Sequence, residues 1–243
     1  MRIRQWIAVA CGVALGAGAA VAVAQVGGAV APTDQGLIKV KSNQLDDVYV
    51  LPGADFRGYR KVMLDPTQVA FNENWLRNLN SPSQRIAVLQ GTTPEEARRI
   101  AEEMGAGFGN TLANAFQSAG YEIVAAPGAD VLRLSPRIVD LHINAPKTVT
   151  QALPSRVYTF DAGRATLELE ARDSTTNALQ ARISDRRTAG VQRGPRAPNL
   201  TTTVTNRFDF GNLFDAWAQS CLKTVEQMKA QSPVVATIQA QRQ

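Results

Sequence analysis

The chain has 243 residues, of which 44% are hydrophobic and 19% are charged, and its formal net charge is +5. This composition excludes a fully disordered chain and predicts one globular domain with a substantial core. The small positive excess does not indicate a nucleic-acid-binding protein, and it suits mild attraction to anionic envelope polymers or to lipid head groups.

The first residues have the features of an export signal. Arg2 and Arg4 form a short positive region, and residues 6–23 form an apolar run rich in small side chains. A small-x-small pattern ends at Ala24, which is typical of a cleavage site. We therefore predict a signal peptide over residues 1–24 and a mature protein in the periplasm, either free or associated with the outer membrane.

Three alternatives remain open for this end of the chain. A retained membrane anchor is disfavoured, because the apolar run is rich in small residues and lacks a charged flank. A second small-x-small pattern ends at Ala31. Cys11 is a candidate for lipidation, because it follows an apolar triplet that is close to a lipobox. However, only residues 5–10 separate Cys11 from the basic region, whereas the apolar core of a signal peptide normally spans about 7–15 residues. Removal of the signal leaves 24 basic and 21 acidic side chains, a net charge of +3, and Cys221 as the remaining cysteine. An intramolecular disulfide is then excluded.

Residues 25–45 have little periodicity and are predicted to form a flexible linker. An α/β domain is predicted over residues 46–230, followed by a disordered tail over residues 231–243. Turn residues separate several β-prone runs near the start of this domain. The three predicted strands there cover residues 48–50, residues 60–64 with an extension over residues 69–71, and residues 86–89.

The clearest predicted element is a helix over residues 94–119. Thr93 and Glu96 form a capping box, Pro94 suits the first helical position, and Gly120 is a natural stop. Three glycines inside the helix resemble a phosphate-binding loop only superficially, because such a loop precedes its helix. Close packing against a sheet, or a kink, is the expected role of these three: Gly105, Gly107 and Gly109.

A short strand over residues 121–125 precedes a long one over residues 131–145. The inward apolar residues of the long strand are even-numbered as far as Ile138 and odd-numbered from Val139 onward. Because side chains alternate strictly along a strand, this change requires one extra residue. We therefore predict a β-bulge or a break near residues 136–139.

The strongest hairpin pattern joins residues 165–172 to residues 179–184. The apolar residues of both runs are odd-numbered, and directly opposed residues must share a face. The connecting loop is therefore predicted to have three or five residues. Either register places Arg182 opposite Glu170 or Glu168, on the solvent side of the sheet.

Residues 189–205 are polar and are predicted to form a long loop. A last helix is predicted over residues 212–229, with Cys221 inside its apolar stripe as a core residue. Strand-rich runs with two helices predict an α+β fold, in which one mostly antiparallel sheet carries both helices packed on one face. The other face of that sheet is then partly polar.

Residues 49–71 resemble the opening of an uncharacterised bacterial family of envelope lipoproteins, domain of unknown function 3313. Trp75, residues 134–140 and residues 185–187 are also similar to this family. The resemblance spans residues 47–228. It implies an α/β domain of the envelope and, for many members, a lipidated N-terminus; it implies no catalytic residues. The poor lipobox before Cys11 departs from this pattern.

Two pairs of ionisable side chains are candidates for catalysis. Asp140 and His142 share the polar face of one strand, which is a weak pattern for an acyl-transfer triad because a nucleophile elbow is missing. Glu168 and Glu170 share a strand face as well, but neighbouring arginines favour neutralised surface charge over a glycosidase pair. We predict no catalytic residues, with a periplasmic hydrolase that uses Asp140 and His142 as the alternative.

Arginines cluster at the hairpin end and in the loop that follows, where binding sites often lie. Guanidinium groups suit phosphate and carboxylate partners. The predicted anion- or partner-binding residues are Arg186, Arg187, Arg193 and Arg196, joined by Arg207. The sequence thus predicts a non-catalytic binding or assembly module without cofactor or metal. Its expected partner is another envelope component, a protein or an anionic polymer, and peripheral membrane association is compatible with this.

Overall fold

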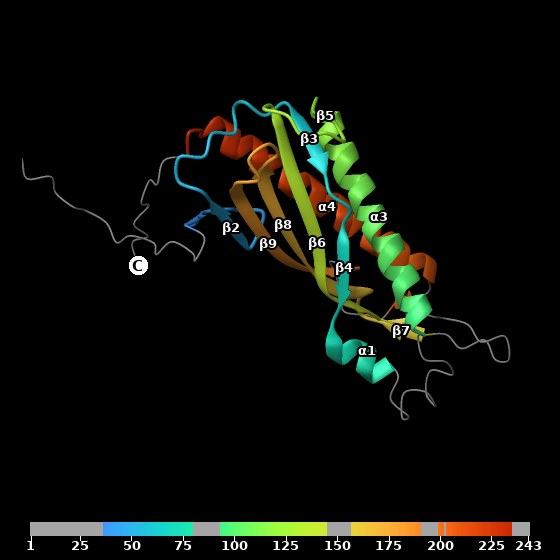
Figure 1. Ribbon diagram of the computed structural model, residues 1–243. Coiled ribbons are helices and arrows are strands. Elements are labelled where there is room, and N and C mark those ends of the chain that lie inside the picture. The colour runs from blue at the N-terminus through green and yellow to red at the C-terminus, as the bar shows by residue number, and fades with distance from the viewer. Residues whose placement is uncertain (1–35, 80–92, 145–156, 191–198, 202, 235–243) are drawn as a thin grey trace, which may run out of the picture. The chain divides into compact units, whose positions relative to one another are not determined.

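The computed structural model describes residues 36–79, 93–144, 157–190, 199–201 and 203–234 (Figure 1). The predicted strand over residues 86–89 lies outside these ranges. The described elements, in chain order, are β1 Ile38–Val40, β2 Asp47–Val50, β3 Lys61–Leu64, β4 Gln68–Phe71, α1 Glu73–Leu79, α3 Pro94–Ser118, β5 Glu122–Ile123, β6 Val131–Ile143, β7 Val157–Thr159, β8 Gly163–Asp173, β9 Leu179–Ala189, β10 Asn199–Thr201 and α4 Thr203–Ala230.

Eight strands form one sheet, in which β1, β2, β9, β8, β6, β3 and β5 follow one another and β4 also pairs with β6. The pairs from β1 across to β6 are antiparallel. β3 is parallel to β5 and to β6, and β4 is parallel to β6. The predicted α+β fold with a mostly antiparallel sheet is confirmed, with a parallel part at one side.

The long helices α3 and α4 pack against each other and cover one face of the sheet (Figure 1). Alternate residues of β8, among them Leu167 and Leu169, are buried on this face. Phe108 of α3 and Trp217 of α4 are fully buried, and their ring centroids lie 6.0 Å apart in an edge-to-face arrangement. The core therefore lies between the sheet and the two helices.

The start and the packing of α3 follow its sequence. Glu96 N donates to Thr93 Oγ1 at 3.2 Å, and Thr93 N donates to Glu96 Oε2 at 2.9 Å, so the predicted capping box is present. A Cβ added to Gly105 would lie 2.7 Å from the backbone carbonyl oxygen of Thr67. The predicted close packing is therefore confirmed for Gly105, which lets the helix lie directly on the segment before β4.

β6 changes its inward-facing residues at a bulge. Ile138 and Leu141 are both fully buried, although they are an odd number of residues apart. The pairing with β8 shifts between Val139 and His142, and Asp140 between them has a φ of 52°. The predicted bulge is present, just beyond the predicted position.

β8 and β9 form the predicted hairpin in the predicted register. Leu169 lies opposite Ile183, and Glu170 lies opposite Arg182. The five residues 174–178 connect the two strands, one of the two lengths expected. Both strands are longer than predicted, because β8 begins at residue 163 and β9 continues to residue 189.

Both ends of the predicted domain need correction. The predicted linker over residues 25–45 contains β1, and Leu37 just before this strand is buried. A strand of three residues is too short to show alternation, which explains the error. At the other end, Val234 is buried and its backbone N donates to Ala54 O at 2.9 Å. The predicted tail therefore begins with residues that pack on the domain.

The segment before α4 also differs from the prediction. β7 and β10 pair as a separate antiparallel ribbon, and α4 begins at Thr203 rather than near Asn212. The described part of the predicted loop over residues 189–205 is therefore partly strand and helix. Threonine, asparagine and Gly211 are weak helix formers and obscure the helical pattern in this stretch. Packing of the apolar face against α3 outweighs these propensities.

Candidate functional site

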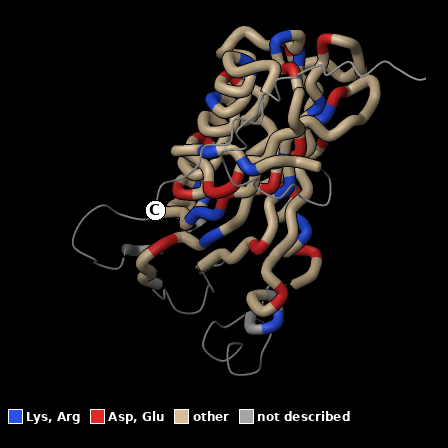
Figure 2. Tube along the Cα trace, turned by 90° about the vertical axis from the view of Figure 1, so that its left-hand side faces the viewer, with Lys and Arg blue, Asp and Glu red and all other residues tan. Residues whose placement is uncertain are grey.

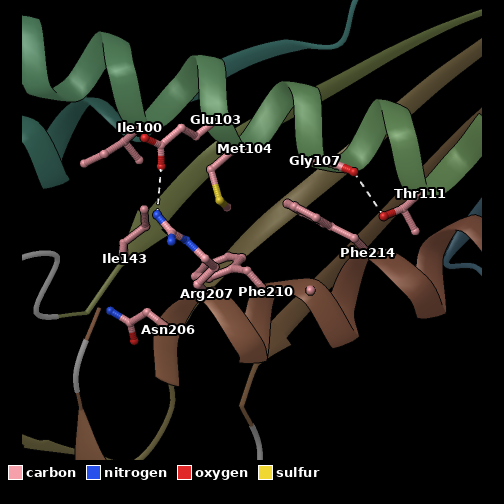
Figure 3. A pocket seen from close by; sticks show the side chains of 11 residues that line it. Ile100, Glu103, Met104, Gly107, Thr111, Ile143, Asn206, Arg207, Phe210 and Phe214 are labelled. Carbon is pink, nitrogen blue, oxygen red and sulfur yellow. Dashed lines mark hydrogen bonds and ion pairs between the residues drawn. The ribbon is translucent and has the colours of Figure 1, made fainter. Parts of the chain in front are cut away.

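A pocket of about 310 Å³ lies between α3 and α4, close to the end of β6 (Figure 3). Its walls are mainly apolar side chains. Ile100 and Met104 come from α3, Phe210 and Phe214 from α4, and Ile143 from β6. Small-molecule sites are typically apolar hollows of about 300–1,000 Å³ with a few polar groups. This pocket is therefore the candidate functional site.

Two glycines on facing helices keep the pocket open. Gly107 of α3 and Gly211 of α4 both line it. A Cβ added to Gly211 would meet no atom within 4 Å, and one added to Gly107 would lie 3.7 Å from the nearest ring atom of Phe214. Each helical glycine costs about 1 kcal/mol relative to alanine. A larger side chain at either position would occupy the pocket.

One ion pair joins the two helices at the rim of the pocket, and the dashed line between Glu103 and Arg207 in Figure 3 marks it. Arg207 Nη2 of α4 lies 3.3 Å from Glu103 Oε2 of α3, and the two side chains are 74% and 55% exposed. A pair this exposed contributes only about 0–1 kcal/mol to stability. Both charged groups are therefore available to a ligand at little cost.

A buried amide attaches the first turn of α4 to the end of β6. Asn206 is buried, and its Nδ2 donates to Asn144 O at 2.8 Å. This bond holds the start of α4 against the strand that supplies Ile143. The apolar wall and the charged rim are thereby placed next to each other.

Exposed apolar side chains lie beside the pocket. Val204 and Phe208 are 76% and 67% exposed and are one turn apart on α4. Residues three or four positions apart are neighbours on a helix surface, so these two side chains flank Arg207 and Gly211. Apolar side chains are therefore exposed on α4 next to two of the residues that line the pocket.

Asp140 and His142 do not bond to each other. His142 Nε2 lies 3.2 Å from Asn144 Oδ1. The Asp140 carboxylate accepts a hydrogen bond from Asn72 Nδ2 and lies 3.2 Å from Arg186 Nη2. In a catalytic triad the carboxylate orients the imidazole, which is not the arrangement found here.

The surroundings of the imidazole also favour its neutral form. Burial lowers the pKa of His142, and the positive charge of Arg164 on the neighbouring strand acts in the same direction. The imidazole ring lies 6.1 Å from the indole of Trp75, measured between ring centroids. The neutral form of His142 is thus favoured, and its ring lies beside an aromatic residue.

The open face of the sheet carries alternating charges that neutralise one another. Arg182 Nη2 and Arg172 Nη2 each lie 2.7 Å from a carboxylate oxygen of Glu170, and Arg137 lies 3.3 Å from Glu168. Burial alone would raise the pKa of Glu170, but the hydrogen bonds from Arg182 and Arg172 outweigh it and the pKa is lowered. The predicted neutralised surface charge is therefore present, and Figure 2 shows basic and acidic residues interspersed over the domain.

The predicted arginine cluster is divided between two faces. Successive residues of a strand point to opposite sides of the sheet. Arg186 is on the open face beside Asp140, whereas Arg187 Nε donates to the buried carboxylate of Asp185 at 2.6 Å on the helix side. Arg207 is at the pocket rim. The remaining two residues of the cluster lie outside the described ranges: Arg193 and Arg196.

Cys221 is fully buried in the core, as predicted, and burial raises the pKa of its thiol to about 12. Cys11 lies outside the described residues. Within the described ranges, no group of three or more His, Cys, Asp or Glu side chains is placed to hold a metal ion. Among the described helices, none combines the length and the apolar character needed to cross a bilayer.

The pocket itself was not predicted. Met104, Phe210 and Phe214 belong to apolar helical stripes, and the sequence gives such stripes the appearance of a filled core. The available signal was a glycine within each stripe, Gly107 and Gly211, because a missing side chain between large apolar residues leaves space. The pairing of these two glycines depends on how the helices cross, which sequence periodicity does not specify.

Solved structures with a similar chain path include PelC from Paraburkholderia phytofirmans, described as a dodecamer. It is 12% identical, with 71% of this chain and 96% of that chain covered and a TM-score of 0.33. Protein XCC0632 from Xanthomonas campestris is also 12% identical, with 74% and 91% covered and a TM-score of 0.37. None of the curated protein sequences compared with the chain matches it. A family model described as "Protein of unknown function (DUF3313)" matches residues 31–220, and the chain therefore belongs to this family.

Proposed function

We propose that the protein is exported to the cell envelope and acts there as a non-catalytic binding module through the pocket between α3 and α4. The pocket carries this proposal, because it is apolar, open to a ligand and maintained by Gly107 and Gly211 at a cost in helix stability. Export is supported by the signal-like pattern of residues 1–24. The expected partners are other components of the envelope.

The alternative function is a hydrolase that uses Asp140 and His142. It has less support, because Asp140 is bonded to Asn72 and Arg186 while His142 bonds to Asn144. Replacing His142 with alanine separates the two. A binding module should keep its cellular phenotype in this variant, whereas loss of the phenotype in a folded variant would favour the hydrolase.

Binding is tested with N-phenylnaphthylamine, a neutral dye whose fluorescence rises in apolar surroundings. Gly211→Leu would place an apolar side chain in the pocket, and its Cβ would meet no atom within 4 Å. We expect this variant to bind the dye at least about tenfold more weakly than the wild type. Ala216→Leu is the matched control, because Ala216 is exposed on the far side of the same helix.

Equal dye binding by the wild type and by Gly211→Leu would show that the pocket is not the binding site. Export is tested separately by the intact mass of the protein from fractionated cells. A start at Gln25 or Pro32, or a diacylglyceryl group on Cys11, would support export. An unprocessed chain in the cytoplasmic fraction would contradict it.

A further inference from the structure

We propose that the pocket binds the hydrocarbon chain of a fatty-acid-like amphiphile and that Arg207 holds the anionic head group of this ligand. The inference rests on the proposed function and adds the chemical class of the ligand. The apolar chain of such a ligand matches the apolar walls of the pocket, and its anionic head matches Arg207 at the rim.

The size and lining of the pocket suit a medium-length hydrocarbon chain. A cavity of about 150 Å³ is known to hold one benzene molecule, so about 310 Å³ accommodates roughly twice as many carbon atoms, about a dozen. Ile100, Phe210 and Phe214 offer no hydrogen-bonding side-chain group to a ligand in the interior. Met104 is flexible and can adapt to a chain of variable conformation.

The shape of the apolar surface favours a chain over a compact ligand. The pocket lies between two helices, and the exposed apolar side chains of Val204 and Phe208 are next to Arg207 and Gly211 on the surface of α4. A longer chain could thus remain in contact with apolar groups beyond the pocket. Burial of each additional methylene group favours binding by removing apolar area from water.

Arg207 is the cation at the rim, and its only ion pair in the described residues is with Glu103. Because this pair is exposed, a ligand carboxylate can replace Glu103 at little cost. A guanidinium group binds a carboxylate through two parallel hydrogen bonds. Glu103 would then remain beside the ligand head group, and its carboxylate would repel the negatively charged head group.

This arrangement predicts opposite effects for the two rim residues. The probes are dodecanoate and its neutral counterpart dodecanol, each used below its micelle concentration to displace N-phenylnaphthylamine. In the wild type we expect dodecanoate to bind about tenfold more tightly than dodecanol. Arg207→Gln should abolish this preference, and Glu103→Gln should increase the affinity for dodecanoate about threefold. Dodecanol binding should change little in either variant.

The control is Arg98→Gln, an exposed arginine of α3 that does not line the pocket; it should leave both affinities unchanged. If the dye binds the pocket but dodecanoate does not displace it, the ligand class is wrong and the proposed binding function stands. If both probes bind equally and Arg207→Gln has no effect, the head-group assignment is wrong. If the dye itself does not bind, the proposed function fails as well.

Discussion

Replacing Asp185 with alanine is expected to lower the free energy of unfolding by about 3–5 kcal/mol. The carboxylate is only 3% exposed, and three donors point at it. Trp217 Nε1 donates at 2.8 Å, Arg187 Nε at 2.6 Å and Asp46 N at 2.9 Å. Alanine would leave these donors without this acceptor and would leave the Arg187 charge uncompensated. Breaking a buried ion pair from one side costs about 3–5 kcal/mol.

Urea unfolding of the mature protein, followed by tryptophan fluorescence and far-ultraviolet circular dichroism, measures this loss. A domain of this kind typically has about 5–15 kcal/mol of stability, so the variant should still fold in the absence of denaturant. Asp215→Ala, at an exposed aspartate of α4, is the control and should change the value by no more than about 0.5 kcal/mol. A loss of less than about 1.5 kcal/mol for Asp185→Ala would refute the assigned role of the carboxylate.

Two further predictions concern stability. Gly105→Ala should cost about 1–3 kcal/mol because its Cβ would lie 2.7 Å from the carbonyl oxygen of Thr67. Gly109→Ala, whose Cβ would lie 3.5 Å from Thr67 Oγ1, should instead add up to about 1 kcal/mol; urea titrations that rank the two variants the other way would contradict this. Burial raises the pKa of Tyr59 and of Cys221 to about 12, so both hold their protons more tightly when folded. The stability that these two groups contribute is fully present below their unfolded-state pKa values, 10.0 for Tyr59 and 9.0 for Cys221, and is lost as the pH rises toward 12. Unfolding free energies that stay constant from pH 8 to pH 12 would rule this out.

The hairpin of β8 and β9 was predictable because the residue pattern that specifies it lies within a short stretch of sequence. Apolar residues such as Leu169 and Ile183 occupy positions of one parity, and parity alone limits the register. The bulge in β6 was predictable for the same reason, since a change of parity at Ile138 requires one extra residue. Its placement on Asp140 depends on which residue tolerates a positive φ, and the alternation of apolar residues does not contain that information.

Other features were not predictable because they depend on distant contacts. The first turns of α4 contain weak helix formers and are held by contacts such as that between Asn206 and Asn144. The pairing of Arg207 with Glu103 joins two helices that are far apart in the sequence. Both contacts lie at the pocket, so helical periodicity identified apolar residues such as Met104 and Phe214 but not the space that they enclose.

The bulge in β6 decides which side chain reaches the ligand. In a regular strand that kept all of these residues and had no bulge, Asp140 and His142 would face the helices and Ile143 would face the open side of the sheet. The apolar wall of the pocket therefore depends on the bulge as well as on residue identity. Deleting Asp140 would bring Leu141 to the second position after Ile138, so a shorter strand without a bulge would present the same apolar wall. Strand length and bulge are thus coupled, and changing one without the other would turn ionisable side chains toward the pocket.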